Sequence, residues 1–295
     1  MAGVRSEVSV DRSVQERVDA RVGTSLRQKY RLDRVLGVGS CGAVYEATHR
    51  NGMRVAVKVL HPEIATASDA RSRFLREGYI ANRIEHAGVV RILDDDEDEE
   101  TTFLVMELLE GSTLADEWRA AGHRLGRARA VAIGAELLDV LVAAARANVV
   151  HRDLKPDNVF VVGPDRRLKV LDFGIARLLD QPRATPTGDA LGAAEFVAPE
   201  LARGRARDAD ARADVYAVGA MLFAFLTGRF VHDGKNPLER MIVTATTPAP
   251  AVRRFAPDLD EDLAHVVDVA LSFDRELRWP SAAAMRAALM EMRPG

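Results

Sequence analysis

The amino-acid sequence predicts an α+β protein that has a small antiparallel β lobe with one key helix and a larger, mainly α-helical lobe. Short runs rich in β-branched residues occupy positions 30–106, and the chain after Gly111 has mostly helical periodicity. Strands that come first and helices that follow are typical of this segregated arrangement. With 295 residues, the chain is long enough to bury a sizeable core in one large or two modest domains.

The β-rich part is predicted from four short runs within positions 30–106. The pair Asn51-Gly52 separates two of them and favours the tight turn of an antiparallel hairpin. A helical pattern over 69–84 interrupts the series. The runs are RLDRVLGVG, AVYEATH, RVAVKVL and TFLVMEL.

Helical periodicity is strongest over 128–146 and recurs over 214–226 and 281–292. Residues 1–27 form a separate N-terminal tail of polar and mixed-charge composition. Valines at helical spacing in this segment permit an amphipathic helix, but its composition favours a frayed tail. The acidic run 94–100 is interpreted as a solvated turn, with a docking role as the alternative.

The composition excludes several classes of protein. Hydrophobic residues make up 47% of the chain and charged residues 29%, values that exclude wholesale disorder. A single cysteine excludes an internal disulfide and a cysteine-based zinc site. The net charge of −3 argues against nucleic-acid binding through overall basicity. The longest uncharged stretch, 215–228, is too short to span a bilayer and the N-terminus has no apolar signal region, so we expect no membrane segment.

A glycine-rich motif, GVGSCG at positions 37–42, lies between two strand-like runs. Glycines let the backbone approach a phosphate chain closely and present N–H groups to it. In a dinucleotide-binding fold this motif opens a helix, whereas here a strand-like run follows, so that fold is disfavoured. Taken alone, the motif also fits a plain glycine-rich hairpin.

Lys58 shares one face of its predicted strand with Ala56 and Leu60, because side chains alternate along a strand. A lysine on an inward face needs an anionic partner, since an unpaired buried ammonium group is costly. Glu77 is the one charge on the apolar stripe of the predicted helix 69–84. We therefore predict a Lys58–Glu77 ion pair beside a phosphate site; a Glu77 side chain that reaches solvent is the alternative.

The strongest chemical signal is the string HRDLKPDN at 151–158, followed by LDFG at 171–174. Two carboxylates and one amide, those of Asp153, Asp172 and Asn158, fall within this short stretch. Hard oxygen ligands of this kind suit Mg²⁺ that is bound jointly with phosphates. The two strings therefore predict a magnesium site linked to phosphate chemistry.

These motifs resemble the signature of the protein kinase family, and the resemblance covers residues 28–292. Five parts occur in order: the glycine-rich loop, the strand lysine, the catalytic loop, the metal-binding aspartate and the string APE at 198–200. The string DFGIAR, the TPT at 185–187 and the compact C-terminal helices resemble the bacterial branch of eukaryotic-like Ser/Thr protein kinases. The resemblance implies a bilobal protein-kinase-like fold, with an N-lobe over about 28–107 and a C-lobe over about 108–292.

The resemblance implies a nucleotide site in the N-lobe. The glycine-rich loop would cover the phosphates of ATP, and Lys58, positioned by Glu77, would hold the α- and β-phosphates. Met106 resembles the gatekeeper, and backbone groups of Glu107 and Leu109 would face adenine. The residues assigned to ATP binding are Leu36, Gly37, Gly39, Gly42, Val44, Ala56, Lys58, Met106, Glu107 and Leu109.

The resemblance implies a catalytic site in the C-lobe. Asp153 would accept the proton of the substrate hydroxyl, and Lys155, the residue typical of Ser/Thr kinases at this place, would steady the γ-phosphate. Asn158 and Asp172 would hold Mg²⁺. The residues that resemble structural ones of the family are Asp214, Glu200 and Arg278.

Regulation is implied by residues near the catalytic string. Arg152, directly before the catalytic aspartate, resembles the arginine of kinases that are switched by phosphorylation of the activation loop. Thr185 and Thr187 are the candidate phosphorylation sites, because a phosphate would add roughly −2 charge for an arginine to bind; plain loop threonines are the alternative. Ala193 stands where the family usually has threonine, so one orienting hydrogen bond is missing. Cys41 is interpreted as a tolerated small residue rather than an oxidation switch.

We therefore expect an active serine/threonine protein kinase that transfers the γ-phosphate of ATP, with Mg²⁺, to Ser or Thr hydroxyls. The expected partners are protein substrates and, for trans-autophosphorylation, a second copy of the chain as a homodimer; no nucleic acid is expected, and the expected location is cytoplasmic. One alternative is a pseudokinase or nucleotide-binding scaffold with weak or partner-dependent transfer. Another is a small-molecule kinase of the aminoglycoside or choline type, which the full string at 151–158 disfavours.

Overall fold

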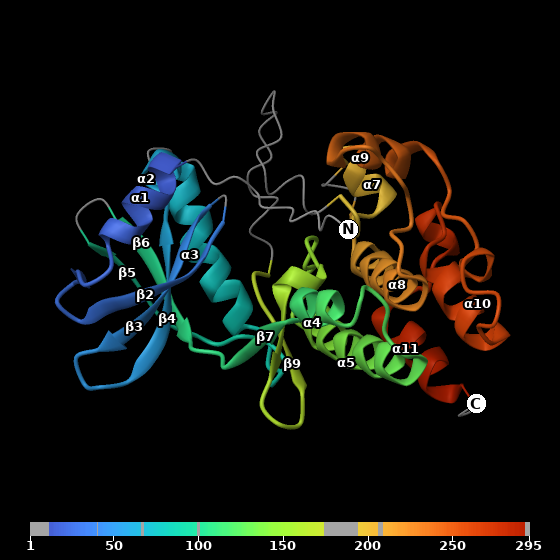
Figure 1. The fold of residues 1–295 in the computed structure, drawn as a ribbon, viewed down its shortest axis with the longest axis horizontal. Helices are drawn as coiled ribbons and strands as arrows, with labels where there is room; N and C mark the ends of the chain where they lie inside the picture. Colours follow the sequence, from blue (N-terminus) through green and yellow to red (C-terminus); the bar gives the residue numbers. More distant parts are fainter. Residues whose placement is uncertain are drawn as a thin grey trace. The chain divides into compact units, whose positions relative to one another are not determined.

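The computed structural model describes residues 12–39, 41–65, 68–98, 101–173, 194–205 and 209–292, except the side chains of residues 68–70, 73 and 77. The described residues form two compact units (Figure 1). The first unit comprises residues 12–79 and 91–109, and the second comprises the described residues among 80–90 and 110–292.

An antiparallel sheet is the main element of the first unit. In its described part the strand order is β1-β2-β3-β4-β6-β5 (Figure 1). The predicted hairpin turn at Asn51-Gly52 is confirmed between β3 and β4, and Gly52 takes a φ of 90° that favours glycine. The strands are β1 (Ser25–Leu26), β2 (Tyr30–Val38), β3 (Gly42–His49), β4 (Arg54–Leu60), β5 (Ile92–Asp98) and β6 (Thr101–Glu107).

Two helices, α2 (Pro62–Ala65) and α3 (Ser68–Asn82), follow β4, and α3 confirms the helix predicted over 69–84. The predicted alternation along β4 is also confirmed. Its valines on one face join the core cluster of the sheet, whereas Leu60 on the other face packs with Leu104 and Phe74 of α3. Both faces of β4 are therefore covered, as expected for a central strand.

The acidic run is not a turn as far as the structure describes it, because its residues up to Asp98 belong to the edge strand β5. The strand pairs along its length with β6, and neighbouring polar groups compensate its charges. The Tyr30 hydroxyl donates to Asp94 Oδ2 at 2.8 Å, and Arg27 Nε donates to Asp96 Oδ1 at 3.2 Å. Cross-strand pairing and these partners outweigh the low strand propensity of aspartate.

The interpretation of the N-terminal segment as a frayed tail is wrong for the part that forms the helix α1 (Arg12–Ala20). Val18 is 4% exposed and joins the core cluster of the sheet, and Val14, one turn earlier, packs against the same cluster. The Tyr45 hydroxyl donates to the carbonyl oxygen of Val18 at 3.1 Å. One apolar stripe is enough to hold this otherwise polar helix on the sheet.

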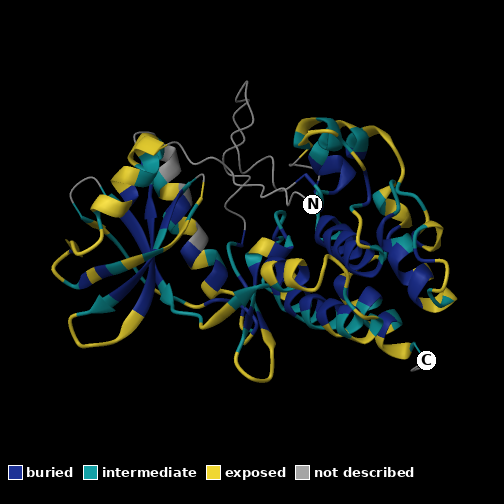
Figure 2. Cartoon of the chain, in the orientation of Figure 1, coloured by how far each residue is buried: buried dark blue, intermediate teal, exposed yellow. Residues whose placement is uncertain are grey.

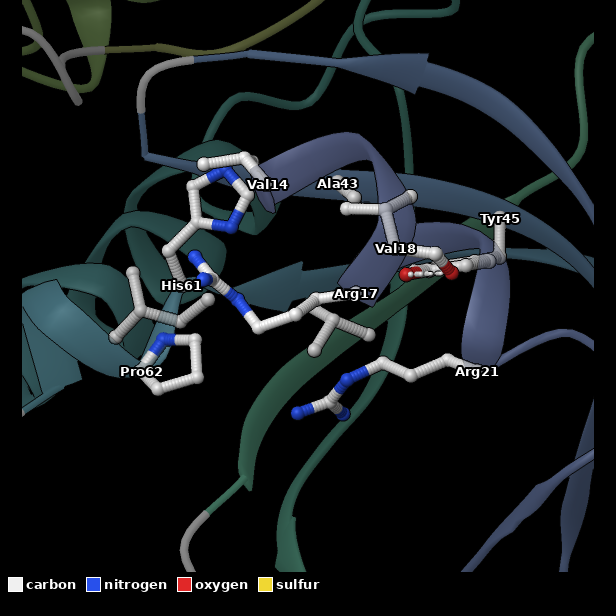
Figure 3. A pocket seen from close by; sticks show the side chains of 10 residues that line it. Val14, Arg17, Val18, Arg21, Ala43, Tyr45, His61 and Pro62 are labelled. Carbon is white, nitrogen blue, oxygen red and sulfur yellow. Dashed lines mark hydrogen bonds between the residues drawn. The ribbon is translucent and has the colours of Figure 1, made fainter. Parts of the chain in front are cut away.

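The contact of α1 with the sheet also encloses a small pocket. It is lined by residues of α1, β3, β4 and the segment that leads into α2 (Figure 3). At its edges, Arg17 forms an ion pair with Glu63 of α2, and Arg21 Nη1 donates to Thr101 Oγ1 of β6 at 3.3 Å. α1 and Arg21, the residue that follows it, are therefore tied to β3, α2 and β6 of the first unit.

The second unit is mainly helical, and its central helix α8 is buried along nearly its whole length (Figure 2). The helices predicted over 128–146, 214–226 and 281–292 are confirmed as α5, α8 and α11. In the part of the chain that the structure describes, no helix is both long enough and apolar enough to cross a bilayer. The elements are α4 (Leu114–Ala120), α5 (Arg127–Arg146), α7 (Pro199–Ala202), α8 (Arg212–Thr227), α9 (Pro237–Thr246), α10 (Glu261–Ala270), α11 (Ala282–Glu291) and a sheet of β7 (Gly111–Thr113), β8 (Val159–Val162) and β9 (Arg167–Val170).

Candidate active site

The glycine-rich segment joins β2 to β3 in the first unit. The Gly39 N–H donates to the Gly42 carbonyl oxygen at 2.9 Å, and His61 Nε2 lies 2.9 Å from the Gly39 carbonyl oxygen. A Cβ on Gly42 would lie 2.1 Å from the Val59 carbonyl oxygen, so only glycine fits there. A Cβ on Gly37 would meet no atom of the described residues within 4 Å. Packing therefore demands glycine at position 42, whereas at position 37 there is room for a ligand close to the backbone.

One face of the sheet gathers four residues assigned to ATP binding. Val44 lies opposite Lys58, and Met106 lies opposite Ala56. Opposed residues of an antiparallel pair share a face, and so do residues two apart on one strand. Lys58 is 7% exposed, so water screens its charge little. The side chain of Glu77 lies outside the described residues, and the Lys58–Glu77 pair stays a prediction.

The predicted hinge residues lie at the end of the first unit. Glu107 ends β6 and is held by Arg91: the Glu107 N–H donates to the Arg91 carbonyl oxygen at 3.0 Å, and the Arg91 N–H donates to Glu107 Oε1 at 2.8 Å. Leu109, two residues later, is half-buried, and Leu36 of β2 is 40% exposed. Both leucines keep apolar surface that an adenine ring can cover.

The predicted catalytic residues of the second unit lie together on the segment 151–158. Asn158 Nδ2 donates to the Asp153 carbonyl oxygen at 2.9 Å and to Asp153 Oδ2 at 3.0 Å. Lys155 Nζ lies 3.5 Å from the same Oδ2, and the side chains of Lys155 and Asp153 are 15% and 17% exposed. These contacts occupy one carboxylate oxygen of Asp153 and do not involve the other, Oδ1.

Asp214 of α8 braces this segment. Its two carboxylate oxygens accept hydrogen bonds from the N–H groups of His151, at 2.7 Å, and Arg152, at 2.8 Å. Arg152 has a φ of 66°, a conformation that costs a non-glycine residue about 1–3 kcal/mol, and the two charge-assisted bonds offset that cost. Burial raises the pKa of Asp214, while the charges and hydrogen bonds of His151 and Arg152 oppose the rise. These contacts are the ones that a bracing acid requires.

Asp172 is brought near Asn158 by the end of β9. The Leu171 N–H donates to the Asn158 carbonyl oxygen at 2.9 Å, and His151 Nε2 lies 2.9 Å from the Leu171 carbonyl oxygen. Asp172 itself has a φ of 54°. The ring of Phe173 is buried with its centroid 4.7 Å from that of His151. Hydrogen bonds on one side and a buried ring on the other therefore fix the backbone at Asp172.

The oxygen atoms of these residues fit a hard divalent cation. Asp172 would supply carboxylate oxygens, and Asn158 would supply Oδ1, because its Nδ2 is used by Asp153. Among the described residues, no three His, Cys, Asp or Glu side chains form a metal-binding group. Mg²⁺ usually binds one or two protein carboxylates and takes its other ligands from water and phosphates, so Asp172 and Asn158 are the residues that would hold it.

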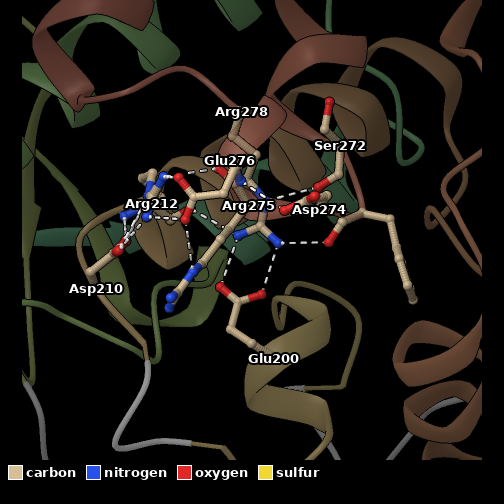
Figure 4. A network of polar contacts seen from close by, with 9 residues as sticks. Glu200, Asp210, Arg212, Ser272, Asp274, Arg275, Glu276 and Arg278 are labelled. Carbon is tan, nitrogen blue, oxygen red and sulfur yellow. Dashed lines mark hydrogen bonds and ion pairs between the residues drawn. The ribbon is translucent and has the colours of Figure 1, made fainter.

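The predicted structural ion pair is confirmed in the second unit. Arg278 Nη1 and Nη2 donate to Glu200 Oε1 and Oε2 at 2.8 and 2.7 Å. The Arg278 side chain is fully buried, its guanidinium carbon lies 5.0 Å from the centroid of the Tyr216 ring, and its Nε donates to the Ser272 carbonyl oxygen at 2.8 Å. Figure 4 shows this pair beside a second cluster around Arg212. The pair joins α7 to the segment that precedes α11.

Sequence reasoning missed one largely buried ion pair, that of Glu195 with Arg240 of α9. The two side chains are 12% and 16% exposed. A signal was present, because Glu195 is the one charge in the otherwise uncharged stretch 192–199. No spacing rule, however, joins it to a residue 45 positions later.

Three residues singled out in the sequence, Thr185, Thr187 and Ala193, lie outside the described residues. The phosphorylation candidates and the effect of the missing hydroxyl therefore stay predictions. Cys41 is described and half-buried, and its carbonyl oxygen accepts a hydrogen bond from the His61 N–H at 2.9 Å.

A family model described as protein kinase domain matches residues 30–290. The chain is similar to serine/threonine-protein kinase Pkn1 of Myxococcus xanthus, with 39% identity over 88% of this chain and 38% of the relative. It is also similar to serine/threonine-protein kinase PknA of Mycobacterium tuberculosis, with 32% identity over 93% of this chain and 64% of the relative. The chain thus spans less than two thirds of the length of these relatives.

Solved structures with a similar fold include the crystal structure of the Mycobacterium tuberculosis PknI kinase domain. It matches with a TM-score of 0.71 and 27% identity, and the match covers 91% of this chain and 98% of that chain. A second crystal structure of the same domain matches with a TM-score of 0.70 and 28% identity, over 91% of this chain and 97% of that chain. The predicted fold class is confirmed by this likeness.

Proposed function

Because the chain belongs to the protein kinase domain family, we propose that it is an ATP-dependent serine/threonine protein kinase. The observation that carries the proposal is the contact of Asp153 with both Lys155 and Asn158, a geometry that fits transfer of a phosphoryl group to a hydroxyl. The similar proteins are named serine/threonine-protein kinases, and their matches cover most of this chain. The proposal concerns the matched region alone.

Phosphoryl transfer requires mainly positioning and charge stabilisation from the protein. Asp153 Oδ1 accepts the proton of the attacking hydroxyl, while Asn158 and Lys155 hold Oδ2 and so orient the carboxylate. Lys155 also adds positive charge beside the transferred group. Asn158 Oδ1 and Asp172 would hold Mg²⁺, which neutralises charge on the phosphate oxygens when it is bound.

ATP would bind to the sheet face of the first unit that carries Val44, Ala56, Lys58 and Met106. The small Ala56 side chain leaves space for a flat ring, and Val44 supplies apolar contact. Lys58 attracts phosphate strongly, because its buried ammonium group is little screened by water. The backbone at Gly37 has room for a phosphate chain, as no described atom lies within 4 Å of the position of a Cβ there.

Regulation by phosphorylation of Thr185 or Thr187 is part of the proposal. Arg152 Nε is buried and has no hydrogen-bond partner among the described residues. A buried guanidinium donor without a partner supports an anion as the missing acceptor, and a phosphothreonine supplies one. We also propose that the chain phosphorylates protein substrates and that it autophosphorylates in trans as a homodimer. Its proposed location is cytoplasmic.

The test is intact-mass measurement with site mapping after incubation with Mg-ATP. We expect phosphate on Thr185 or Thr187 of the parent chain and none on the Lys58→Ala and Asp172→Asn variants. Incorporation per molecule should rise with protein concentration if transfer occurs in trans. Phosphate on Asp172→Asn at the parent rate would contradict the assignment of Asp172.

A parent chain that binds Mg-ATP but incorporates no phosphate, with or without an added protein substrate, would overturn the proposal. That result would favour a pseudokinase or a partner-activated enzyme. Ala193→Thr is the variant to build next in that case, because it restores the hydroxyl that the family usually has at this position.

A further inference from the structure

The ion pair of Glu195 and Arg240 is fixed on its arginine side. Arg240 Nη1 donates to Glu195 Oε1, and Arg240 Nη2 reaches the Gly234 carbonyl oxygen at 3.4 Å. The guanidinium group also lies 5.0 Å from the centroid of the Phe230 ring, which meets the Phe196 ring edge to face at 5.9 Å. Charge and stacking together hold Arg240 in one position, and Arg240 in turn holds Glu195.

Glu195 uses only one of its oxygens in these contacts. Oε2 is buried and accepts no hydrogen bond from any described residue. A buried charged oxygen without a donor is unfavourable, so it indicates a place where a donor arrives. Burial raises the pKa of Glu195; a hydrogen bond from its own backbone N–H and the charges of Arg240 on α9 and Lys155 on the catalytic segment lower it, and the charge of Asp157 raises it.

The ammonium group of Lys155 can donate further hydrogen bonds in this region. An ammonium group carries three N–H donors, and the contact of Lys155 Nζ with Asp153 Oδ2, at 3.5 Å, is longer than a normal hydrogen bond. The lysine side chain is only 15% exposed, so little water is present to take the remaining donors. The charge of Lys155 lowers the pKa of Glu195, so this under-used donor lies in the neighbourhood of the buried oxygen that lacks one.

We propose that Glu195 is a positioning residue for Lys155: its free oxygen accepts one N–H of the ammonium group, and Arg240 fixes the carboxylate for that purpose. This inference rests on the proposed kinase function. Alternating charges then run from Asp153 through Lys155 and Glu195 to Arg240. Held between Asp153 and Glu195, the ammonium group of Lys155 stays oriented toward the transferred phosphate.

The direct test is Glu195→Gln, an isosteric change that removes the charge. With myelin basic protein as the phosphoacceptor, we expect kcat to fall about tenfold, the effect of one charge-assisted hydrogen bond, because Lys155 loses its second anchor. KM for ATP should stay within about twofold, since the residues assigned to ATP lie on other elements. The matched control is Glu261→Gln, which removes an exposed partner of Arg253 and should change neither constant.

Exchanging the charges of Glu195 and Arg240 distinguishes a positioning role of Glu195 from a purely structural ion pair. The double variant Glu195→Arg, Arg240→Glu keeps an ion pair but places a cation beside Lys155. We expect the melting temperature to recover relative to Arg240→Glu alone, while kcat stays at or below that of Glu195→Gln. If kcat recovers together with the melting temperature, the pair is only structural and the inference is overturned.

The pH profile provides a readout that does not depend on the double variant folding. Protonated Glu195 resembles glutamine, so the ratio of parent kcat to Glu195→Gln kcat should fall toward one as the pH falls through the raised pKa of Glu195. A ratio that is constant with pH would count against the inference. If the parent is active and Glu195→Gln stays within twofold of it, the inference fails alone; if the parent transfers no phosphate, the proposed function itself fails.

Discussion

The side-chain amide of Asn158 donates twice to Asp153, through Nδ2 at 2.9 Å to the carbonyl oxygen and at 3.0 Å to carboxylate Oδ2. This arrangement assigns different tasks to the atoms of both side chains. With Nδ2 engaged, Oδ1 is the amide atom that remains for a cation. With Oδ2 engaged by Asn158 and approached by Lys155 at 3.5 Å, Oδ1 is the oxygen of Asp153 that remains for a proton.

Asp153→Asn tests that division of tasks. Loss of the general base should lower kcat by about 10²–10⁴-fold and leave KM for ATP nearly unchanged, because the amide keeps the shape but cannot accept the proton. Phosphate incorporation into a protein substrate at saturating Mg-ATP is the measurement. Asp262→Asn, an exposed change on α10, is the control and should retain parent activity.

Two glycines of the glycine-rich motif, Gly37 and Gly42, should respond differently to alanine. Gly42→Ala places a Cβ 2.1 Å from the Val59 carbonyl oxygen, and the strand backbone must shift to admit it. We expect it to lower the free energy of unfolding by about 1–3 kcal/mol, as overpacking does. Thermal unfolding without nucleotide measures this effect.

Gly37→Ala is the matched comparison, because its Cβ meets no described atom within 4 Å. Its melting temperature without nucleotide should equal that of the parent, while the stabilisation by Mg-ATP should shrink if the backbone there approaches phosphate. Equal melting temperatures for both variants in the absence of ATP would contradict the assigned difference between the two positions.

Sequence patterns predicted the elements whose signal is local. The helix expected over 69–84 forms as α3 (Ser68–Asn82), and the segment 151–158 brings Asp153 and Asn158 into contact within five residues. Short separations of this kind leave the chain few alternatives once the local backbone is set.

Features that depend on distant partners were not predictable from such patterns. The helix α1 forms because Val18 packs into the core of the sheet. The composition of residues 1–27 does not indicate this contact. β5 is a strand because it pairs with β6, and because Arg27 and Tyr30 donate hydrogen bonds to its carboxylates. The Glu195–Arg240 contact joins residues 45 positions apart, and neither residue predicts the other.

The Glu200–Arg278 pair predicts a specific dependence of stability on pH. Burial acts to raise the pKa of Glu200, but the hydrogen bonds and charge of Arg278 outweigh it, and the pKa lies below its usual value. The folded state therefore binds the Glu200 proton less readily than the unfolded state. Its contribution to stability is fully present above the ordinary glutamate pKa and is lost as the pH falls through the lowered value.

Glu200→Gln should accordingly lower the free energy of unfolding by about 3–5 kcal/mol near pH 7, because it leaves a buried arginine without its counter-charge. The difference from the parent should shrink at acidic pH, where the parent carboxylate is itself protonated. Denaturant unfolding at several pH values measures both effects. Glu276→Gln, at a glutamate that is 64% exposed beside Arg212, should change stability far less, and an equal loss in both variants would refute the role given to burial.

The last prediction concerns α1 and uses two valines that differ in burial. Val18 is 4% exposed and Val22 is 40% exposed, although they lie four residues apart. Val18→Asp should lower the free energy of unfolding of the first unit by about 3 kcal/mol, because it removes apolar contact and buries a carboxylate. Val22→Asp should have little effect, since its charge remains in water.

Hydrogen exchange distinguishes loss of the helix from loss of the sheet. In Val18→Asp the backbone amides of α1 should exchange faster. The protection of β3 should also weaken, because the Tyr45 hydroxyl loses its acceptor, the Val18 carbonyl oxygen, when the helix detaches. In Val22→Asp the protection of both elements should match the parent. Equal exchange of α1 in the two variants would mean that Val18 does not hold the helix on the sheet.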